Sequence, residues 1–330
     1  MERHGVAEVD LRFAERRVAL HFAGNRLADA LLGLGALDAR RDDAPGETHA
    51  TIALWEEHVP RAGALPFPWS LADVGPGGLV RGSGADGVVA VHETASGAIT
   101  LVDSRSSVVL HRVPQRAAVP WWERAAPLRP ALFWALGGER RHLVHAGAVG
   151  DDRGGVLIAG ASGSGKTTVA LAALVHGLGY VADDYVLLDS AAEPTAVSLY
   201  GTAKLDGGHV RRFGTLAAAV RFPPPAAAGE KAVLDVAGAM PGSLRASLPV
   251  CAVVVPRIRG GRTRLVRVRP AEALLALGPS TVFQMPFDGG AALAALAAVV
   301  RAVPCFALEV GDDAAELARA VDQVLDQAAS

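Results

Sequence analysis

The loop at residues 160–168 constrains this chain more than any other part of its sequence. It reads Gly-Ala-Ser-Gly-Ser-Gly-Lys-Thr-Thr and satisfies the pattern G-x-x-x-x-G-K-S/T. The apolar residues 156–159 precede it, and residues 166–176 have a helical pattern, so the loop is expected to connect a strand to a helix. There the glycines let backbone N–H groups turn inward, and the helix N-terminus adds a partial positive charge. The sequence therefore predicts a phosphate-binding loop.

This loop predicts binding of a nucleoside triphosphate, which we expect to be ATP with Mg²⁺. Lys166 is expected to reach the β- and γ-phosphates, and the Thr167 hydroxyl is expected to be a magnesium ligand. The alternative is a flexible glycine- and serine-rich linker, which the flanking strand and helix argue against. The predicted nucleotide-binding residues are Gly160, Ala161, Ser162, Gly163, Ser164, Gly165, Lys166, Thr167 and Thr168.

A pair of acids, Asp183 and Asp184, follows the short strand expected at residues 180–182. Phosphoryl transfer needs one carboxylate to orient or deprotonate the attacking hydroxyl and another to hold magnesium, directly or through water. We expect the pair to supply both, the alternative being a solvated turn before the next strand. His145 lies on the strand before the loop strand, and its spacing alone fits a phosphate site and an ordinary core or surface position equally well.

Composition excludes several classes of function. The 330 residues carry a net charge of −2, so no global basic field favours nucleic acid. The two cysteines, Cys251 and Cys305, lie far apart in apolar runs, which fits a reducing compartment better than a disulfide framework. The first residues lack the apolar stretch of a signal peptide, and the longest apolar runs are shorter than the ~20 residues of a membrane-spanning helix. We expect a cytoplasmic protein without a membrane span.

The chain is expected to be a mixed α/β protein in three parts. Residues 1–120 contain short runs rich in β-branched residues and predict a mostly β lobe of structural or substrate-contacting role. Residues 121–140 predict a connecting helix that Pro127 and Pro130 interrupt. Residues 141–330 alternate strand and helix patterns around the loop and predict an ATP-binding domain.

Three stretches together resemble the HPr kinase/phosphorylase family: His145-Ala-Gly-Ala-Val, the strand and loop at residues 155–168, and Gly179-Tyr-Val-Ala-Asp-Asp-Tyr. The resemblance implies a phosphoenolpyruvate-carboxykinase-like fold, and an enzyme that phosphorylates a serine on a small protein. Carried over by position, it implies that Lys166 binds phosphate and that Thr167 supplies the magnesium-binding hydroxyl. It further implies that Asp183 is the base, that Asp184 supports metal or substrate, and that His145 lines the phosphate site.

The chain also departs from that family. The second family signature, E-x-R-G-x-G, is absent downstream, and Leu199-Tyr-Gly-Thr-Ala-Lys-Leu-Asp stands in its place. This stretch resembles a branch of HPr-kinase-like proteins that includes kinases of natural-product precursor peptides. The segments beginning at Glu230, Leu244 and Pro279 also resemble that branch. The resemblance makes Lys204, Lys231 and Arg245 candidates to neutralise phosphate charge, although each is also consistent with a surface cation.

Three functions are consistent with these features. The first is an ATP-dependent kinase whose partner is a peptide or small protein carrying an acceptor serine. The second is a small-molecule kinase, although in such enzymes the phosphate loop usually opens the chain and here it begins at residue 160. The third is a non-catalytic, nucleotide-binding regulatory protein. The sequence leaves the oligomeric state open, including a homo-oligomer.

Overall fold

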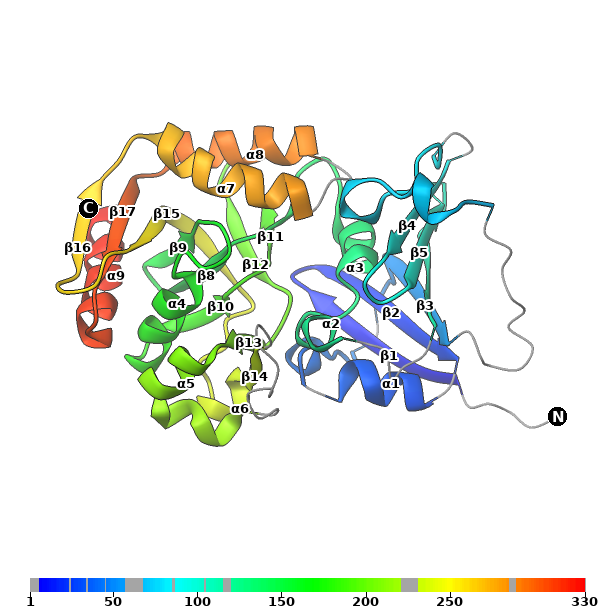
Figure 1. Cartoon of the computed structure of the whole chain (residues 1–330), viewed down its shortest axis with the longest axis horizontal. Helices are drawn as coiled ribbons and strands as arrows, with labels where there is room; N and C mark the ends of the chain where they lie inside the picture. The colour runs from blue at the N-terminus through cyan, green and yellow to red at the C-terminus, as the bar shows by residue number, and fades with distance from the viewer. Residues whose placement is uncertain are drawn as a thin grey trace. The chain divides into compact units, whose positions relative to one another are not determined.

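The computed structural model describes residues 6–23, 25–33, 35–44, 46–56, 68–84, 87–103, 105–114, 120–220, 231–284 and 289–329. Glu230, which begins one of the segments singled out above, lies outside them. The chain divides into two compact units, Met1–Gly138 and Glu139–Ser330 (Figure 1). Both units contain helices and sheets with parallel and antiparallel neighbours, so the protein is a mixed α/β protein. No helix in the described part of the chain is long and apolar enough to cross a membrane.

The first unit is built on one six-stranded sheet, in the order β1-β2-β3-β6-β5-β4. β3 pairs in parallel with both β2 and β6, and the outer pairs are antiparallel. The buried faces alternate along β3, as expected for a strand with one face on a core. The elements are β1 (Val6–Phe13), β2 (Arg16–Ala23), β3 (Ala50–Glu56), β4 (Val88–Glu93), β5 (Ala98–Asp103), β6 (Val108–Val113), α1 (Asn25–Leu32), α2 (Trp121–Ala125) and α3 (Arg129–Leu136).

The segment expected as one interrupted helix forms two, α2 and α3. Leu128 lies between them in the left-handed conformation (φ 60°), and its backbone N–H donates to the Glu123 side chain at 2.8 Å. Pro127 lies in the break. Pro130 falls in the first turn of α3, where its missing N–H costs no intrahelical hydrogen bond, so it starts this helix and does not break it.

His111 on β6 is a buried titratable group in the core of the first unit. Its Nδ1 lies 3.0 Å from the Thr100 hydroxyl, and burial lowers the pKa of the imidazole from 6.5 to about 4. Between these values the unfolded chain binds a proton that the folded unit does not, so stability rises with pH across this window. Acidification from pH 6.5 to pH 4 therefore removes roughly 3 kcal/mol of unfolding free energy through this one group.

We expect His111→Gln to flatten this pH dependence, whatever it does to the stability at neutral pH. The measurement is urea unfolding between pH 4 and pH 7, with tryptophan fluorescence as the signal. All 5 tryptophans lie within residues 1–138, so the signal reports on the first unit alone. His21→Gln, on β2 of the same unit, is the matched control. An unchanged slope in His111→Gln would show that another group governs acid unfolding.

The second unit contains a nine-stranded mixed sheet. Its order is β10-β8-β9-β15-β12-β11-β7, with β17 beside β15 and β16 beside β17. The strands are β7 (Arg141–Val144), β8 (Gly147–Asp151), β9 (Gly154–Ile158), β10 (Gly179–Ala182), β11 (Val186–Asp189), β12 (Thr195–Ser198), β15 (Ser247–Ile258), β16 (Arg264–Arg267) and β17 (Cys305–Val310). β9 has the antiparallel neighbour β8 on one side and the parallel neighbour β15 on the other, so the sheet differs from an all-parallel one.

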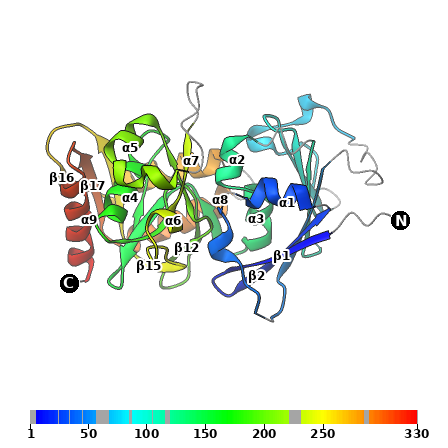
Figure 2. The same ribbon diagram turned by 90° about the horizontal axis from the view of Figure 1, so that it is seen from below.

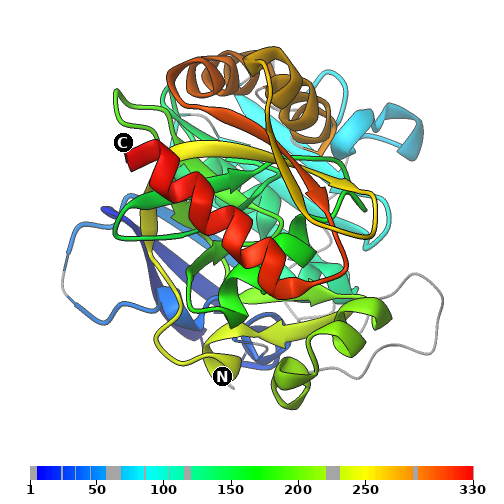
Figure 3. The same ribbon diagram turned by 90° about the vertical axis from the view of Figure 1, so that its left-hand side faces the viewer.

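Helices cover both faces of this sheet. Buried side chains of α4 (Lys166–Val175) and α9 (Ala314–Ala329) form one core with β9, β15 and β17. Those of α7 (Pro270–Gln284) and α8 (Gly289–Ala302) form a second core on the other face. Figure 2 and Figure 3 show α9 lying along the strands, with α7 and α8 apart from it. The strands β13 (Thr202–Leu205) and β14 (Ala232–Asp235) form a separate two-stranded sheet. Each is followed in the chain by a short helix, β13 by α5 (Gly207–Arg212) and β14 by α6 (Val236–Ala239).

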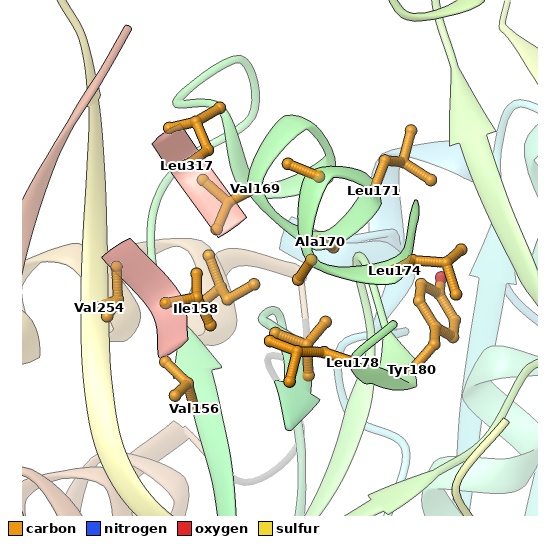
Figure 4. Packing of buried hydrophobic residues seen from close by; sticks show 14 of the residues in the cluster. Val156, Ile158, Val169, Ala170, Leu171, Leu174, Leu178, Tyr180, Val254 and Leu317 are labelled. Carbon is orange, nitrogen blue, oxygen red and sulfur yellow. The ribbon is translucent and has the colours of Figure 1, made fainter. Parts of the chain in front are cut away.

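Helix α4 holds the loop in place because the helix is anchored in the core, with its apolar residues buried on every side. Every residue from 169 to 174 is buried, as expected for a helix that is hydrophobic on all sides. Val169 lies near Leu317 of α9, and Ile158 of the strand that leads into the loop packs in the same core (Figure 4). The helix ends before Gly177, which takes a positive φ of 95°. Strand, loop and helix therefore form one rigid support.

Candidate phosphate-binding site

The glycine-rich loop connects β9 to α4. Gly160, Gly163 and Gly165 all take positive φ values, of 147°, 80° and 106°, a region that side chains rarely adopt. A Cβ at Gly160 would lie 2.3 Å from the Ser164 hydroxyl, so only glycine fits there. These conformations turn the loop back on itself before α4 begins at Lys166. The sequence pattern thus has a direct conformational cause.

Lys166 is a buried cation at the N-terminus of α4. It is 5% exposed, and its Nζ donates to the carbonyls of Gly160 at 2.8 Å and Ala161 at 3.2 Å. Burial lowers the pKa of the ammonium, and the nearby charges of Asp183 and Asp184 oppose this shift. Within the described residues no carboxylate lies in ion-pair contact with it. A buried charge with only neutral contacts is costly, so a bound anion would stabilise it.

Asp183 follows β10 and is held by three hydrogen bonds. Its Oδ2 accepts from the Thr167 hydroxyl and from the Lys204 backbone N–H, each at 3.1 Å, and its Oδ1 lies 3.2 Å from the Tyr180 hydroxyl. The residue is 4% exposed. Burial, together with the negative charge of Asp184, raises the pKa of this carboxyl. Asp183 is therefore a buried residue that fixes the Thr167 hydroxyl in the first turn of α4.

Asp184 has different partners and is held by two basic side chains. Its Oδ1 lies 2.7 Å from His145 Nε2, and its Oδ2 accepts from Lys204 Nζ at 2.6 Å. Burial alone would raise the pKa of this carboxyl, but the Lys204 charge and the His145 hydrogen bond outweigh it and hold the pKa well below its usual range. Burial lowers the pKa of His145. We therefore take His145 as neutral, with Nε2 donating to an ionised Asp184.

Lys204 is brought to the site from β13, but its charge is engaged there. Burial opposes its ionisation, while Asp184 more than compensates and raises the pKa of the ammonium. Its Nζ also lies 4.8 Å from the centre of the Tyr185 ring. Lys204 therefore fixes Asp184, and its charge is already neutralised before any ligand arrives.

The loop opens onto a cavity of about 290 Å³. Its size is near the lower limit of small-ligand sites, which suits a chain of phosphates better than a whole nucleotide. Of the sequence-predicted residues, those that line it are Ser162, Gly163, Gly165, Lys166, Thr167, Thr168, Asp184 and Lys231. The other lining residues are Asp206, Gly208, His209, Arg212 and Ile258.

The remaining predicted residues lie around the cavity or away from it. Gly160 and Ala161 accept hydrogen bonds from Lys166, and Ser164 Oγ is buried. Arg245 differs from the predicted residues that gather around the loop. Its guanidinium donates to the carbonyl oxygens of Gly242 at 2.9 Å and Leu244 at 3.4 Å, and it does not line this cavity. We therefore leave Arg245 out of the site.

Sequence reasoning missed His209 and Arg212, which line the cavity from α5. His209 Nε2 lies 2.9 Å from the Thr168 hydroxyl. Asp206 caps α5 by accepting from the His209 backbone N–H at 2.9 Å. The Asp-x-x-His capping pattern is visible in the sequence, but it signals only a helix start and not a ligand.

The donors at this site suit magnesium that arrives with a nucleotide. The Thr167 hydroxyl and the Asp184 carboxylate line the cavity and offer the oxygen ligands that Mg²⁺ prefers, and Asp183 bonds to Thr167 from outside the cavity lining. Among the described residues no group of three or more His, Cys, Asp or Glu side chains could hold a metal ion. Mg²⁺ usually keeps several waters and binds through one or two carboxylates plus phosphate oxygens, so these donors fit that mode.

Fold and site together define a mixed α/β protein with a glycine-rich loop between β9 and α4. No family model matches the chain, and no curated protein matches it. Among solved structures it is similar to the HPr(Ser) kinase/phosphatase from Coxiella burnetii, with 13% sequence identity and a TM-score of 0.32. That similarity covers 56% of this chain and 95% of the other. A similarity at this score does not bear on what this chain does.

Proposed function

We propose that this protein is an ATP- and magnesium-dependent kinase that transfers the γ-phosphate to a serine hydroxyl of a peptide or small protein. One observation carries the proposal. The loop residues Lys166 and Thr167 and the carboxylate of Asp184 line the same cavity, and Thr167 is bonded to Asp183. A phosphate-binding loop and a carboxylate in one cavity are the two parts that phosphoryl transfer requires. The choice of a serine acceptor rests on the resemblance in the motifs.

Each side chain has a distinct task in this proposal. The loop N–H groups and Lys166 bind the β- and γ-phosphates and neutralise their charge. Asp183 orients the Thr167 hydroxyl toward the metal. Asp184, which lines the cavity, orients the acceptor hydroxyl and accepts its proton. Magnesium, when bound, supplies further charge neutralisation at the phosphates.

These tasks exchange the roles that the resemblance implied for the two aspartates. Asp183 is buried against Thr167, whereas Asp184 lines the cavity, so Asp184 is better placed to meet an acceptor. Its lowered pKa makes it a weak base. A weak base is sufficient because the loose transition state of phosphoryl transfer depends chiefly on positioning and electrostatics.

The direct test is incubation with γ-labelled ATP, magnesium and a library of serine-containing peptides. We expect label in a peptide, in the acid-stable, base-labile form typical of phosphoserine. Label in a small-molecule acceptor with no peptide present would instead identify a small-molecule kinase. Tight ATP binding with neither transfer nor hydrolysis would contradict the proposal and favour a regulatory protein.

A further inference from the structure

One side of the cavity carries basic side chains that have no role in the proposed function as stated so far. His209 and Arg212 come from α5, and Lys231 directly precedes β14. We call these three residues the α5 wall. Two acids, Asp184 and Asp206, also line the cavity. The charge of Asp184 is neutralised by Lys204, and the carboxylate of Asp206 caps the N-terminus of α5. The α5 wall therefore adds cationic charge where phosphate would lie.

Arg212 is held in position without losing its charge. Its Nη2 donates to the Gly311 carbonyl at 2.9 Å, and its guanidinium carbon lies 5.8 Å from the centre of the Phe213 ring. Its Nε is buried without a hydrogen-bond partner. Within the described residues it forms no ion pair, and its Nη1 group and the second Nη2 hydrogen have no hydrogen-bond partner there, so they can donate to an anion. A fixed, unpaired guanidinium lining a cavity is a preorganised anion-binding group.

Lys231 and His209 complete the wall in different ways. Lys231 lines the cavity and makes no ion pair within the described part of the chain. The His209–Thr168 hydrogen bond joins α5 to the first turn of α4. Because the same helix carries Arg212 one turn further on, this bond also fixes the position of Arg212 relative to the loop.

We propose that Arg212 and Lys231 bind the phosphoryl group during its transfer, as catalytic residues additional to Lys166. The proposal rests on the proposed kinase function. As the bond from phosphorus to the serine oxygen forms, the bond to the oxygen bridging the β- and γ-phosphates breaks. The hydroxyl proton passes to Asp184 and then to solvent, and ADP leaves. Negative charge on the transferred group must be met from more than one side, and the loop supplies one of them.

The test uses ADP, magnesium and aluminium fluoride, which together mimic the transferred group and need no acceptor. Calorimetry measures ADP affinity with and without aluminium fluoride. We expect the wild-type protein to bind ADP at least about 100-fold more tightly when aluminium fluoride is present. Arg212→Met should lose most of that gain, about 100-fold, while its affinity for ADP alone stays within about threefold. Lys231→Met should show the same pattern.

Arg211→Met is the matched control, because Arg211 is the exposed neighbour of Arg212 on α5 and does not line the cavity. It should keep the full gain, and Arg212→Lys should keep part of it. A wild-type gain that survives in Arg212→Met and Lys231→Met would overturn the α5-wall proposal alone. A wild-type protein that binds ADP but shows no gain with aluminium fluoride would count against the kinase function itself, and with it the wall.

Discussion

Lys166→Met is expected to abolish nucleotide turnover while leaving the ligand-free protein as stable as the wild type or more so. Lys166 is a buried ammonium whose hydrogen-bond partners are two backbone carbonyls. Methionine has a similar shape and no charge to desolvate, so the apo protein loses little by the change. The phosphates, in contrast, lose the cation that neutralises them, which costs at least about 100-fold in turnover.

Thermal unfolding with and without ATP separates these two effects. At a concentration 100 times its dissociation constant, ATP stabilises the wild-type protein by about 2.7 kcal/mol and raises the melting temperature by several degrees. Lys166→Met should show little or none of this rise. Arg211→Met should show all of it, since Arg211 does not line the cavity. A normal ATP-induced rise in Lys166→Met would mean that the nucleotide binds elsewhere.

The conformation of the loop was the most predictable part of the site, because the motif and the backbone turn depend on the same glycines. Glycines at 160, 163 and 165 are needed for positive φ values, so the motif is visible in one sequence. Asp183 and Asp184 could also be located as candidates, since they follow directly after the next strand. Their separate tasks could not, because adjacent residues at a bend face directions that depend on contacts with Thr167, Lys204 and His145.

Two residues of the α5 wall, His209 and Arg212, were invisible to sequence reasoning for a similar reason. Arg212 resembles any surface arginine until Gly311 and Phe213 are seen to hold it beside the loop. The Gly311 contact joins segments that are far apart in the chain, and no local pattern encodes it. Arg245 illustrates the same point, because a motif likeness gives no information about where its side chain lies, and its guanidinium bonds to the carbonyls of Gly242 and Leu244.

The runs of β-branched residues in the N-terminal segment predict strands, and its described residues form a six-stranded sheet. The order of the strands in this sheet could not be predicted from the sequence. β3 pairs in parallel with β2 and β6, and β6 is separated from it in sequence by β4 and β5. Such pairings depend on which faces the whole sheet must bury, and a single strand does not carry that information.

Asp184→Asn is expected to lower turnover about 100- to 10,000-fold while ATP still raises the melting temperature. The neutral amide cannot accept the proton of the acceptor hydroxyl, whereas the loop and Lys166 are unchanged. The same substitution leaves the Lys204 ammonium buried without a carboxylate, and breaking such a pair costs about 3–5 kcal/mol. A loss of activity in this variant alone could therefore reflect a weakened fold.

The double variant Asp184→Asn/Lys204→Met resolves that ambiguity, because it removes the ammonium that the single variant leaves unpaired. We expect it to regain most of the lost stability and none of the lost activity. Recovery of turnover in the double variant would show that Asp184 serves only to neutralise Lys204, and the assignment of the acceptor-facing carboxylate would fail.

Asp183→Asn should behave differently, because Asp183 bonds to Thr167 and does not line the cavity. Its amide oxygen can still accept from Thr167 and the Lys204 backbone, but the side chain has lost its negative charge and places an NH₂ group where Oδ1 met the Tyr180 hydroxyl. Since changes behind a metal ligand typically weaken metal affinity about 10- to 100-fold, half-maximal activity should require that much more magnesium. Activity restored by high magnesium in Asp183→Asn, but not in Asp184→Asn, would separate the two carboxylates by function as the hydrogen bonds separate them in space.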